Sequence, residues 1–128
     1  MENRHRLSIY GEIIQITDED IDDIMLKGLP AVRDSWCLRW EILGDQLAKY
    51  PYQQISHGGM IKLYSSEPGI EPKYWLTMTK FLDGFRKFCM NQDRKYGAIQ
   101  FGRVHTGLID ETEADQIIQL AVFGEVLF

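Results

Sequence analysis

The sequence has few cysteines, no long apolar run and no recognisable targeting segment. Its two cysteines, Cys37 and Cys89, are too few for a disulfide framework, and we interpret them as buried thiols in a reducing compartment. No apolar stretch approaches the roughly 20 residues that span a bilayer. Arg4 and Arg6 precede only a short apolar stretch that contains Glu12, which argues against a signal peptide. We therefore expect a cytoplasmic protein without a membrane segment.

The sequence also lacks the spacings of metal ligands and nucleophiles that mark an active site. His5, His57 and His105 are far apart, and neither cysteine has a partner at zinc-site spacing. The run DEDIDD (18–23) begins like a calcium-binding EF-hand loop, but the glycine and glutamate required further on are missing. The glycines match no phosphate-binding fingerprint, and no serine lies in G-x-S-x-G. We predict a protein that is not an enzyme and needs no metal or cofactor.

What remains is an ordinary globular composition, with 45% hydrophobic and 26% charged residues in 128 positions. That length is enough to bury one core, so we predict a single domain over residues 1–128. Stretches rich in β-branched or alternating apolar residues predict strands at 6–16, 35–43, 60–65 and 73–78. Apolar residues at helical spacing predict helices after Thr17, over 78–90 and after Asp110. The predicted fold class is α+β: a small antiparallel sheet of three or four strands with about three helices packed on one face.

Local signals fix where the helices begin and end. Thr17 is a predicted N-cap, and Pro30 is expected to disrupt the end of the helix that follows it. Asp110 and Glu113 form a predicted capping box for the last helix, and Gly124 is a natural stop.

The stretch SWCLRWEIL (35–43) alternates in a way that predicts one strongly aromatic strand face. Trp36, Leu38, Trp40 and Ile42 would lie together on that face and be buried in the core. The alternative is that the tryptophans are exposed anchors for a partner, because tryptophan is enriched at interface hot spots.

Charge is unevenly distributed along the chain. The net charge is −5, but residues 73–103 carry seven basic and two acidic side chains, so that segment is +5 and the rest is −10. The overall acidity argues against general affinity for nucleic acid, which requires a strong positive field. The basic segment leaves room for a local anion site.

Within the basic segment, DRKYGAIQFGRVH interleaves cations with aromatic rings. Guanidinium groups bind phosphate and aromatic faces stack on bases, which makes this stretch a candidate anion or nucleotide site. Its candidate residues are Arg94, Lys95, Tyr96, Phe101 and Arg103. The alternative is a solvated loop whose aromatic side chains anchor it to the core.

Acidic residues gather in two places. The first group is a candidate partner-binding surface and comprises Asp18, Glu19, Asp20, Asp22 and Asp23. The second comprises Asp110, Glu111, Glu113 and Asp115. Acids at a helix start also stabilise the helix dipole, which is the simpler interpretation. If the two groups form one exposed surface, that surface would imitate nucleic acid toward a basic protein.

The closing stretch FGEVLF is apolar, and we expect it to be ordered and buried. Phe123, Val126 and Phe128 are a candidate self-association surface, which would give a homodimer through the last helix and tail. The alternative is docking onto the same chain.

Five stretches occur in an order that resembles a family of small phage and prophage proteins. They are ITDEDIDDIMLKGL, SWCLRWEILGD, ISHGGMIKLYSSE, YWLTMTKFLDGFRKF and IDETEADQIIQLAVFGEVLF. The resemblance runs from about Ile16 onward, and ADQIIQLAVFGEV is its most specific stretch. It implies an accessory protein that binds a host macromolecule rather than a particular chemistry. The basic, aromatic stretch NQDRKYGAIQFGRVHTG departs from the short acidic link expected there.

These observations lead to one leading hypothesis and two alternatives. The leading one is a non-enzymatic accessory protein that binds a host protein, such as an anti-CRISPR-like inhibitor of a bacterial defence system. The first alternative is an oligomeric sponge for a small nucleotide signal, and the second is an enzyme whose site is assembled from scattered residues. The leading hypothesis requires contiguous, exposed acids, whereas the sponge requires Arg94, Lys95 and Arg103 to converge on a pocket.

Overall fold

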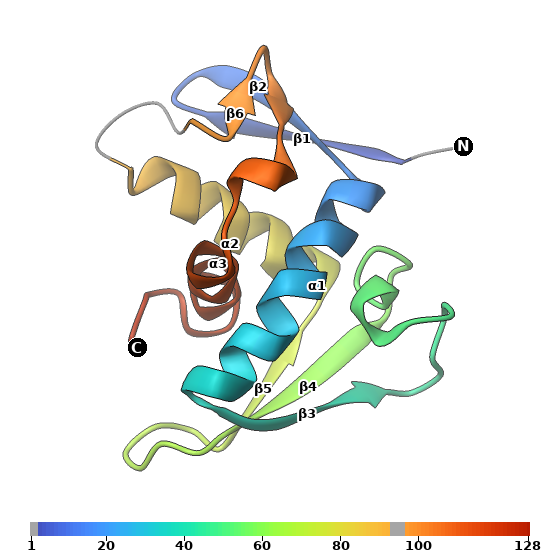
Figure 1. Ribbon diagram of the computed structural model, residues 1–128, viewed down its shortest axis with the longest axis vertical. Coiled ribbons are helices and arrows are strands. Elements are labelled where there is room, and N and C mark those ends of the chain that lie inside the picture. The colour runs from blue at the N-terminus through green and yellow to red at the C-terminus, as the bar shows by residue number, and fades with distance from the viewer. Residues whose placement is uncertain (1–2, 93–96) are drawn as a thin grey trace.

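The computed structural model describes residues 3–92 and 97–128, which form three α-helices and two β-sheets around one apolar core (Figure 1). The helices are α1 (Asp18–Ser35), α2 (Met78–Met90) and α3 (Glu111–Phe123). The strands are β1 (Arg4–Ile9), β2 (Glu12–Thr17), β3 (Cys37–Leu43), β4 (Met60–Ser65), β5 (Lys73–Leu76), β6 (Ile99–Gln100) and β7 (Arg103–Val104). Short 3₁₀ turns lie at η1 (Pro51–Gln53) and η2 (Thr106–Leu108). The α+β class predicted from the sequence is confirmed.

The strands form two sheets instead of one. The first has the order β1-β2-β7-β6, and the second has the order β3-β4-β5. The second sheet is antiparallel throughout, whereas β2 and β7 pair in parallel where Gln15 lies opposite Arg103. Figure 1 shows α1 running from the first sheet to the second, so that one helix links both sheets.

Residues 6–16, predicted as one strand, belong to the β1–β2 hairpin. Tyr10 and Gly11 adopt φ values of 51° and 79°, which suit a two-residue turn between antiparallel strands. Phe101 and Gly102 make the same kind of turn between β6 and β7, with φ values of 53° and 72°. Neither turn has the Asn-Gly or Asp-Gly pair that signals such a hairpin. The apolar pattern of residues 6–16 therefore predicts one strand where the structure has β1 and β2.

Helix α1 continues past Pro30 to Ser35, so the prediction that Pro30 disrupts its end is wrong. Leu29 and Val32 are buried on either side of the proline, while Pro30 itself is exposed. Burial of the core-facing side offsets the backbone hydrogen bond that proline removes. The start of α1 is as predicted, because the Thr17 hydroxyl accepts a hydrogen bond from the backbone N–H of Asp20 in a capping box.

The other two helices begin and end as the sequence predicts. Helix α3 has the Asp110–Glu113 capping box, and Gly124 closes it in the left-handed conformation. Helices α2 and α3 pack closely, since a Cβ added at Gly84 would lie 2.6 Å from the backbone nitrogen of Ala121.

The strand predicted over 35–43 begins at Cys37, and its register shifts between Cys37 and Arg39. Trp36 is the buried C-cap of α1, while Leu38 is exposed, so the predicted single face with Leu38 in the core is wrong. A β-bulge resets the alternation by one residue, which the apolar pattern does not reveal.

Candidate functional site

Helix α1 buries one side in the core, and a neighbouring side of the helix lines a row of hollows. Glu19, Asp23, Lys27, Ala31 and Asp34 follow one another at spacings of three or four residues, which places them on the same side of the helix. Three hollows of about 270, 470 and 340 Å³ lie along this side of α1 and are called the upper, middle and lower hollows. The middle and lower hollows share Glu111 and Thr112, whereas the upper hollow has a lining of its own, and we call the three together the acidic groove.

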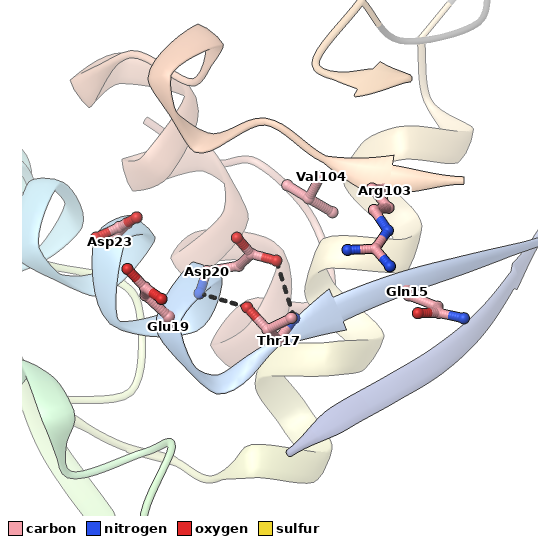
Figure 2. A pocket seen from close by; sticks show the side chains of 7 residues that line it. All are labelled: Gln15, Thr17, Glu19, Asp20, Asp23, Arg103 and Val104. Atoms are coloured by element: carbon pink, nitrogen blue, oxygen red, sulfur yellow. Dashed lines mark hydrogen bonds between the residues drawn. The ribbon is translucent and has the colours of Figure 1, made fainter. Parts of the chain in front are cut away.

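The upper hollow lies between the first turn of α1 and strands β2 and β7. Figure 2 shows the residues that line it: Gln15, Thr17, Glu19, Asp20, Asp23, Arg103 and Val104. Arg103 points toward Asp20 from the opposite strand, yet makes no ion pair within residues 3–92 and 97–128. One guanidinium thus shares a hollow with three carboxylates, which disfavours an anionic ligand here.

The acids of the predicted first group are not equivalent. The structure brings Glu19, Asp20 and Asp23 into the upper hollow, where Asp23 also accepts a hydrogen bond of 2.9 Å from Thr106. Asp18 lies outside it, 2.8 Å from His5 Nε2. The structure therefore brings only part of this group together, and its role in partner binding stays a prediction.

Asp22 is the clearest exception, because it is half-buried on the other flank of α1. One of its carboxylate oxygens is buried and has no hydrogen-bond partner within the described part of the chain. Burial raises the pKa of Asp22, while the neighbouring Ser56 hydroxyl and His57 act in the opposite direction. Asp22 is thus not part of an open acidic surface.

The middle hollow joins α1 to the start of α3. Lys27 donates hydrogen bonds of 2.7 Å to the backbone carbonyls of both Thr106 and Ile109, so two of its three donors are already engaged. Asp110 and Glu111 line the same hollow. Asp110 caps α3 by accepting from the backbone N–H of Glu113, which leaves Glu111 as the carboxylate available to a ligand.

The lower hollow is lined by Asp34, Glu111, Asp115 and Phe128 among others. Asp115 is buried and accepts hydrogen bonds from Trp36 Nε1 at 2.9 Å and from Gln119 Nε2 at 3.0 Å, so its role is structural. Of the second predicted group, then, Glu111 alone adds a free carboxylate to the groove, and Asp34 joins it. Sequence reasoning missed Asp34 because it is isolated, although its helical spacing from Glu19 and Asp23 carries the signal.

The predicted self-association residues dock partly onto their own chain. The rings of Phe123 and Phe128 lie 4.8 and 6.2 Å from that of Trp36, and the Phe128 ring is nearly parallel to it. Backbone N–H groups of the tail donate to Gln119 Oε1. The tail is ordered as expected, but Val126 and Phe128 each remain 42% exposed, so burial is incomplete. A homodimer through this surface stays a prediction.

The two described residues of the predicted nucleotide site, Phe101 and Arg103, do not line one pocket. Arg94, Lys95 and Tyr96 lie outside the described residues. Phe101 is 99% exposed at the tip of the β6–β7 turn and does not line the hollow that holds Arg103.

The remaining candidates for chemistry are unreactive or scattered. Cys37 and Cys89 are buried as predicted, and burial raises the pKa of both thiols, that of Cys89 to about 12, so both stay protonated at neutral pH. Within residues 3–92 and 97–128, no three His, Cys, Asp or Glu side chains are grouped to hold a metal ion. The helices in those ranges are all too short or too polar to cross a membrane.

Comparisons with protein-family models, curated proteins and solved structures found no match to this chain. The resemblance to phage and prophage proteins therefore stays a prediction, and function has to be argued from the geometry.

Proposed function

We propose that this chain is a non-enzymatic binding protein whose acidic groove takes up a basic segment of a protein partner. The observation that carries the proposal is that Glu19, Asp23 and Asp34 on α1, together with Glu111 on α3, line a row of hollows along one side of α1. The 15 residues from Glu19 to Asp34 rise roughly 22 Å along the helix axis. An extended segment of about six or seven residues covers that distance.

The chemistry of the groove suits lysine and arginine side chains of the partner. Carboxylates accept charge-assisted hydrogen bonds from ammonium and guanidinium groups, and these are stronger than neutral ones. Lys27 adds one opposing positive charge, and its ammonium group is held in place by two backbone carbonyls. Arg103 offers a donor for a backbone carbonyl of the bound segment.

The resemblance to phage accessory proteins suggests the class of partner. We infer a nucleic-acid-binding protein in the cytoplasm of a bacterial host, of the kind that defence systems contain. Its basic surface ordinarily holds phosphates, and the acidic groove would occupy that surface in their place. No specific observation favours the nucleotide sponge, since Arg103 shares its hollow with carboxylates, or an enzyme with a scattered site.

A pair of matched variants tests the proposal. The groove variant combines Glu19→Gln, Asp34→Asn and Glu111→Gln, and the control combines Asp45→Asn, Glu67→Gln and Glu71→Gln in loops away from the groove. Exposed ion pairs contribute about 0.2–1 kcal/mol each, so the groove variant should bind a labelled nona-arginine peptide about 3- to 150-fold more weakly. The control should bind as the unmodified chain does. The same three proteins are then used to capture partners from bacterial lysate.

Equal affinity of the two triple variants for the peptide would contradict the proposal. Loss of a captured host protein with the groove variant, but not with the control, would identify the partner that the groove selects.

A further inference from the structure

The outer face of the β3–β4–β5 sheet carries a set of side chains that the acidic groove does not use. Residues directly opposite each other in an antiparallel sheet project from the same face. The register therefore forms two adjacent rows on the outer face, Arg39–Tyr64–Lys73 and Glu41–Lys62–Trp75. These six side chains, from three strands, are called the sheet platform.

The two faces of this sheet differ sharply in burial. On the inner face, Ile61, Leu63 and Leu76 are fully buried, and α1 and α3 lie on that side of the sheet (Figure 1). On the outer face, Arg39 and Lys73 are exposed, and Trp75 keeps 41% of its surface accessible. A large exposed indole on a sheet is unusual, because tryptophan normally contributes its area to a core or an interface.

Arg39 and Tyr64 of the first row are held in position by contacts with each other and with Glu41 of the second row. The Arg39 guanidinium lies 3.8 Å from the centre of the Tyr64 ring, and the Tyr64 hydroxyl donates a 2.6 Å hydrogen bond to Glu41. Glu41 also accepts from Arg39 at 3.1 Å. The hydrogen bond from Tyr64 is the main cause that lowers the pKa of Glu41; burial opposes it, and the hydrogen bond from Arg39 lowers the pKa further. Glu41 is thus ionised and occupied in orienting a planar guanidinium over an aromatic ring.

The second row places a cation between two rings. Lys62 Nζ lies 5.2 Å from the Tyr64 ring centre and 5.6 Å from that of Trp75. Lys62 and Lys73 form no ion pair within the described ranges, and Glu41 is committed to Arg39 and Tyr64. The platform therefore presents two ammonium groups that no carboxylate of the described residues pairs with, one of them beside both aromatic rings.

We propose that the sheet platform binds single-stranded nucleic acid. Unpaired bases stack on the Trp75 indole and on the guanidinium plane that covers Tyr64, since both aromatic rings and guanidinium groups stack on bases. Tyr64 and Trp75 are diagonal neighbours on adjacent strands, roughly 7–8 Å apart, which suits successive bases of one strand. Lys62 and Lys73 hold the phosphates between them.

Positive charge and exposed ring faces together favour single-stranded nucleic acid over other ligands. A basic patch alone would accept any polyanion, and exposed rings alone would accept an apolar surface, whereas single-stranded nucleic acid satisfies both. A duplex hides the faces of its bases and offers phosphates only. The acidic groove repels polyanions, so binding is confined to the platform and does not depend on the function proposed for the groove.

Fluorescence anisotropy of labelled 12-residue oligo(U) and oligo(dT), titrated with the full chain, tests the proposal. We expect saturable binding at 50 mM salt and quenching of tryptophan emission, because Trp75 is the tryptophan that remains exposed. Each phosphate contact on a single strand contributes a slope of about −0.7 in log K against log salt, so the two lysines predict about −1.4. A preference for oligo(U) or for oligo(dT) reports the combined effect of the 2′-hydroxyl and the thymine methyl group, and either preference supports the platform.

Matched variants separate stacking from charge. Trp75→Ala should weaken binding about 5- to 150-fold, the range that loss of one base stack produces. Lys62→Gln combined with Lys73→Gln should flatten the salt dependence and retain the quenching. The controls are Phe101→Ala, an exposed ring elsewhere, and Lys49→Gln, an exposed cation outside the sheet. Both controls should bind like the unmodified chain, and thermal melting checks that every variant is folded.

Several results would overturn the proposal. One is the absence of any anisotropy change with either oligonucleotide at low salt. Another is equal binding of a duplex or of a heparin oligosaccharide of matched charge, because neither offers free bases. A third is binding that Phe101→Ala abolishes while Trp75→Ala leaves it unchanged.

Discussion

The acidic groove and the sheet platform carry opposite charge, and they are assembled in different ways. The groove gathers carboxylates through the periodicity of one helix, with Glu111 added where α3 begins beside it. The platform gathers cations and rings through the register of three strands. Helical periodicity is visible in a sequence, whereas strand register is not, so only the first surface could be anticipated.

The comparison also shows that a run of charge along the chain is not a patch on the surface. The basic segment 73–103 is divided by the fold, because Lys73 joins the platform while Arg103 faces the acids of the upper hollow. The platform instead recruits Arg39 and Lys62 from the part of the chain whose net charge is negative.

The largest expected effect is on the free energy of unfolding, and it distinguishes the two faces of the β3–β4–β5 sheet. Leu63→Ala removes a fully buried side chain and should lower the free energy of unfolding by about 2–5 kcal/mol. Tyr64→Ala, the next residue on the outer face, should cost about 1 kcal/mol or less. Urea denaturation measures both. A cost for Tyr64 as large as that for Leu63 would mean that the platform is structural rather than available to a ligand.

A smaller effect is expected from the tail, which borders the lower hollow through Phe128. Deleting residues 125–128 removes three half-buried apolar side chains and should cost about 2–4 kcal/mol, half of what their full burial contributes. If a second copy covers the exposed remainder, the melting temperature of the intact chain should rise with concentration and the truncated chain should scatter as a monomer. A full-length chain that scatters as a monomer at high concentration would remove the homodimer.

The smallest effect distinguishes Asp22 from the open acids of the groove. Its pKa is raised from about 3.8 by burial, so ionisation opposes folding, and stability is lost as pH rises from the ordinary value through the raised one. Asp22→Asn should therefore match the unmodified chain at pH 3 and exceed it at pH 7 by about 1 kcal/mol or less. Urea denaturation at both pH values measures the difference, with Asp34→Asn as the matched removal of an exposed carboxylate from the same helix. Equal pH dependence of the two variants would place Asp22 among the open acids.

Much of the fold follows from local signals in the sequence. Thr17, Asp110 and Gly124 set helix ends as predicted, because capping depends on side chains within one turn of the end. The prediction from Pro30 was wrong because the free-energy cost of a proline in a helix can be offset by burial of the opposite side, and burial depends on the tertiary structure. The division into two sheets depends on long-range pairing, such as Gln15 with Arg103, which no local pattern encodes.

The candidate sites were less predictable for the same reason. Glu19, Asp20 and Asp23 could be identified from their clustering at a helix start. Whether a carboxylate is open or engaged, as Asp115 is with Trp36, depends on partners remote in the sequence. The platform required the register of β3, β4 and β5, and the bulge after Cys37 shifts that register from the alternation that the sequence suggests.

The central claim is that this small chain carries two separate surfaces of opposite charge, and amide chemical-shift mapping tests it most directly. A ¹⁵N-labelled chain of 14.9 kDa is titrated separately with the nona-arginine peptide and with oligo(U). The peptide should shift amides in residues 19–34 and 106–112, and the oligonucleotide should shift those in 39–43, 60–65 and 73–76. Shifts by both probes in one shared set of residues, or by the oligonucleotide around residues 101–103 alone, would contradict the claim.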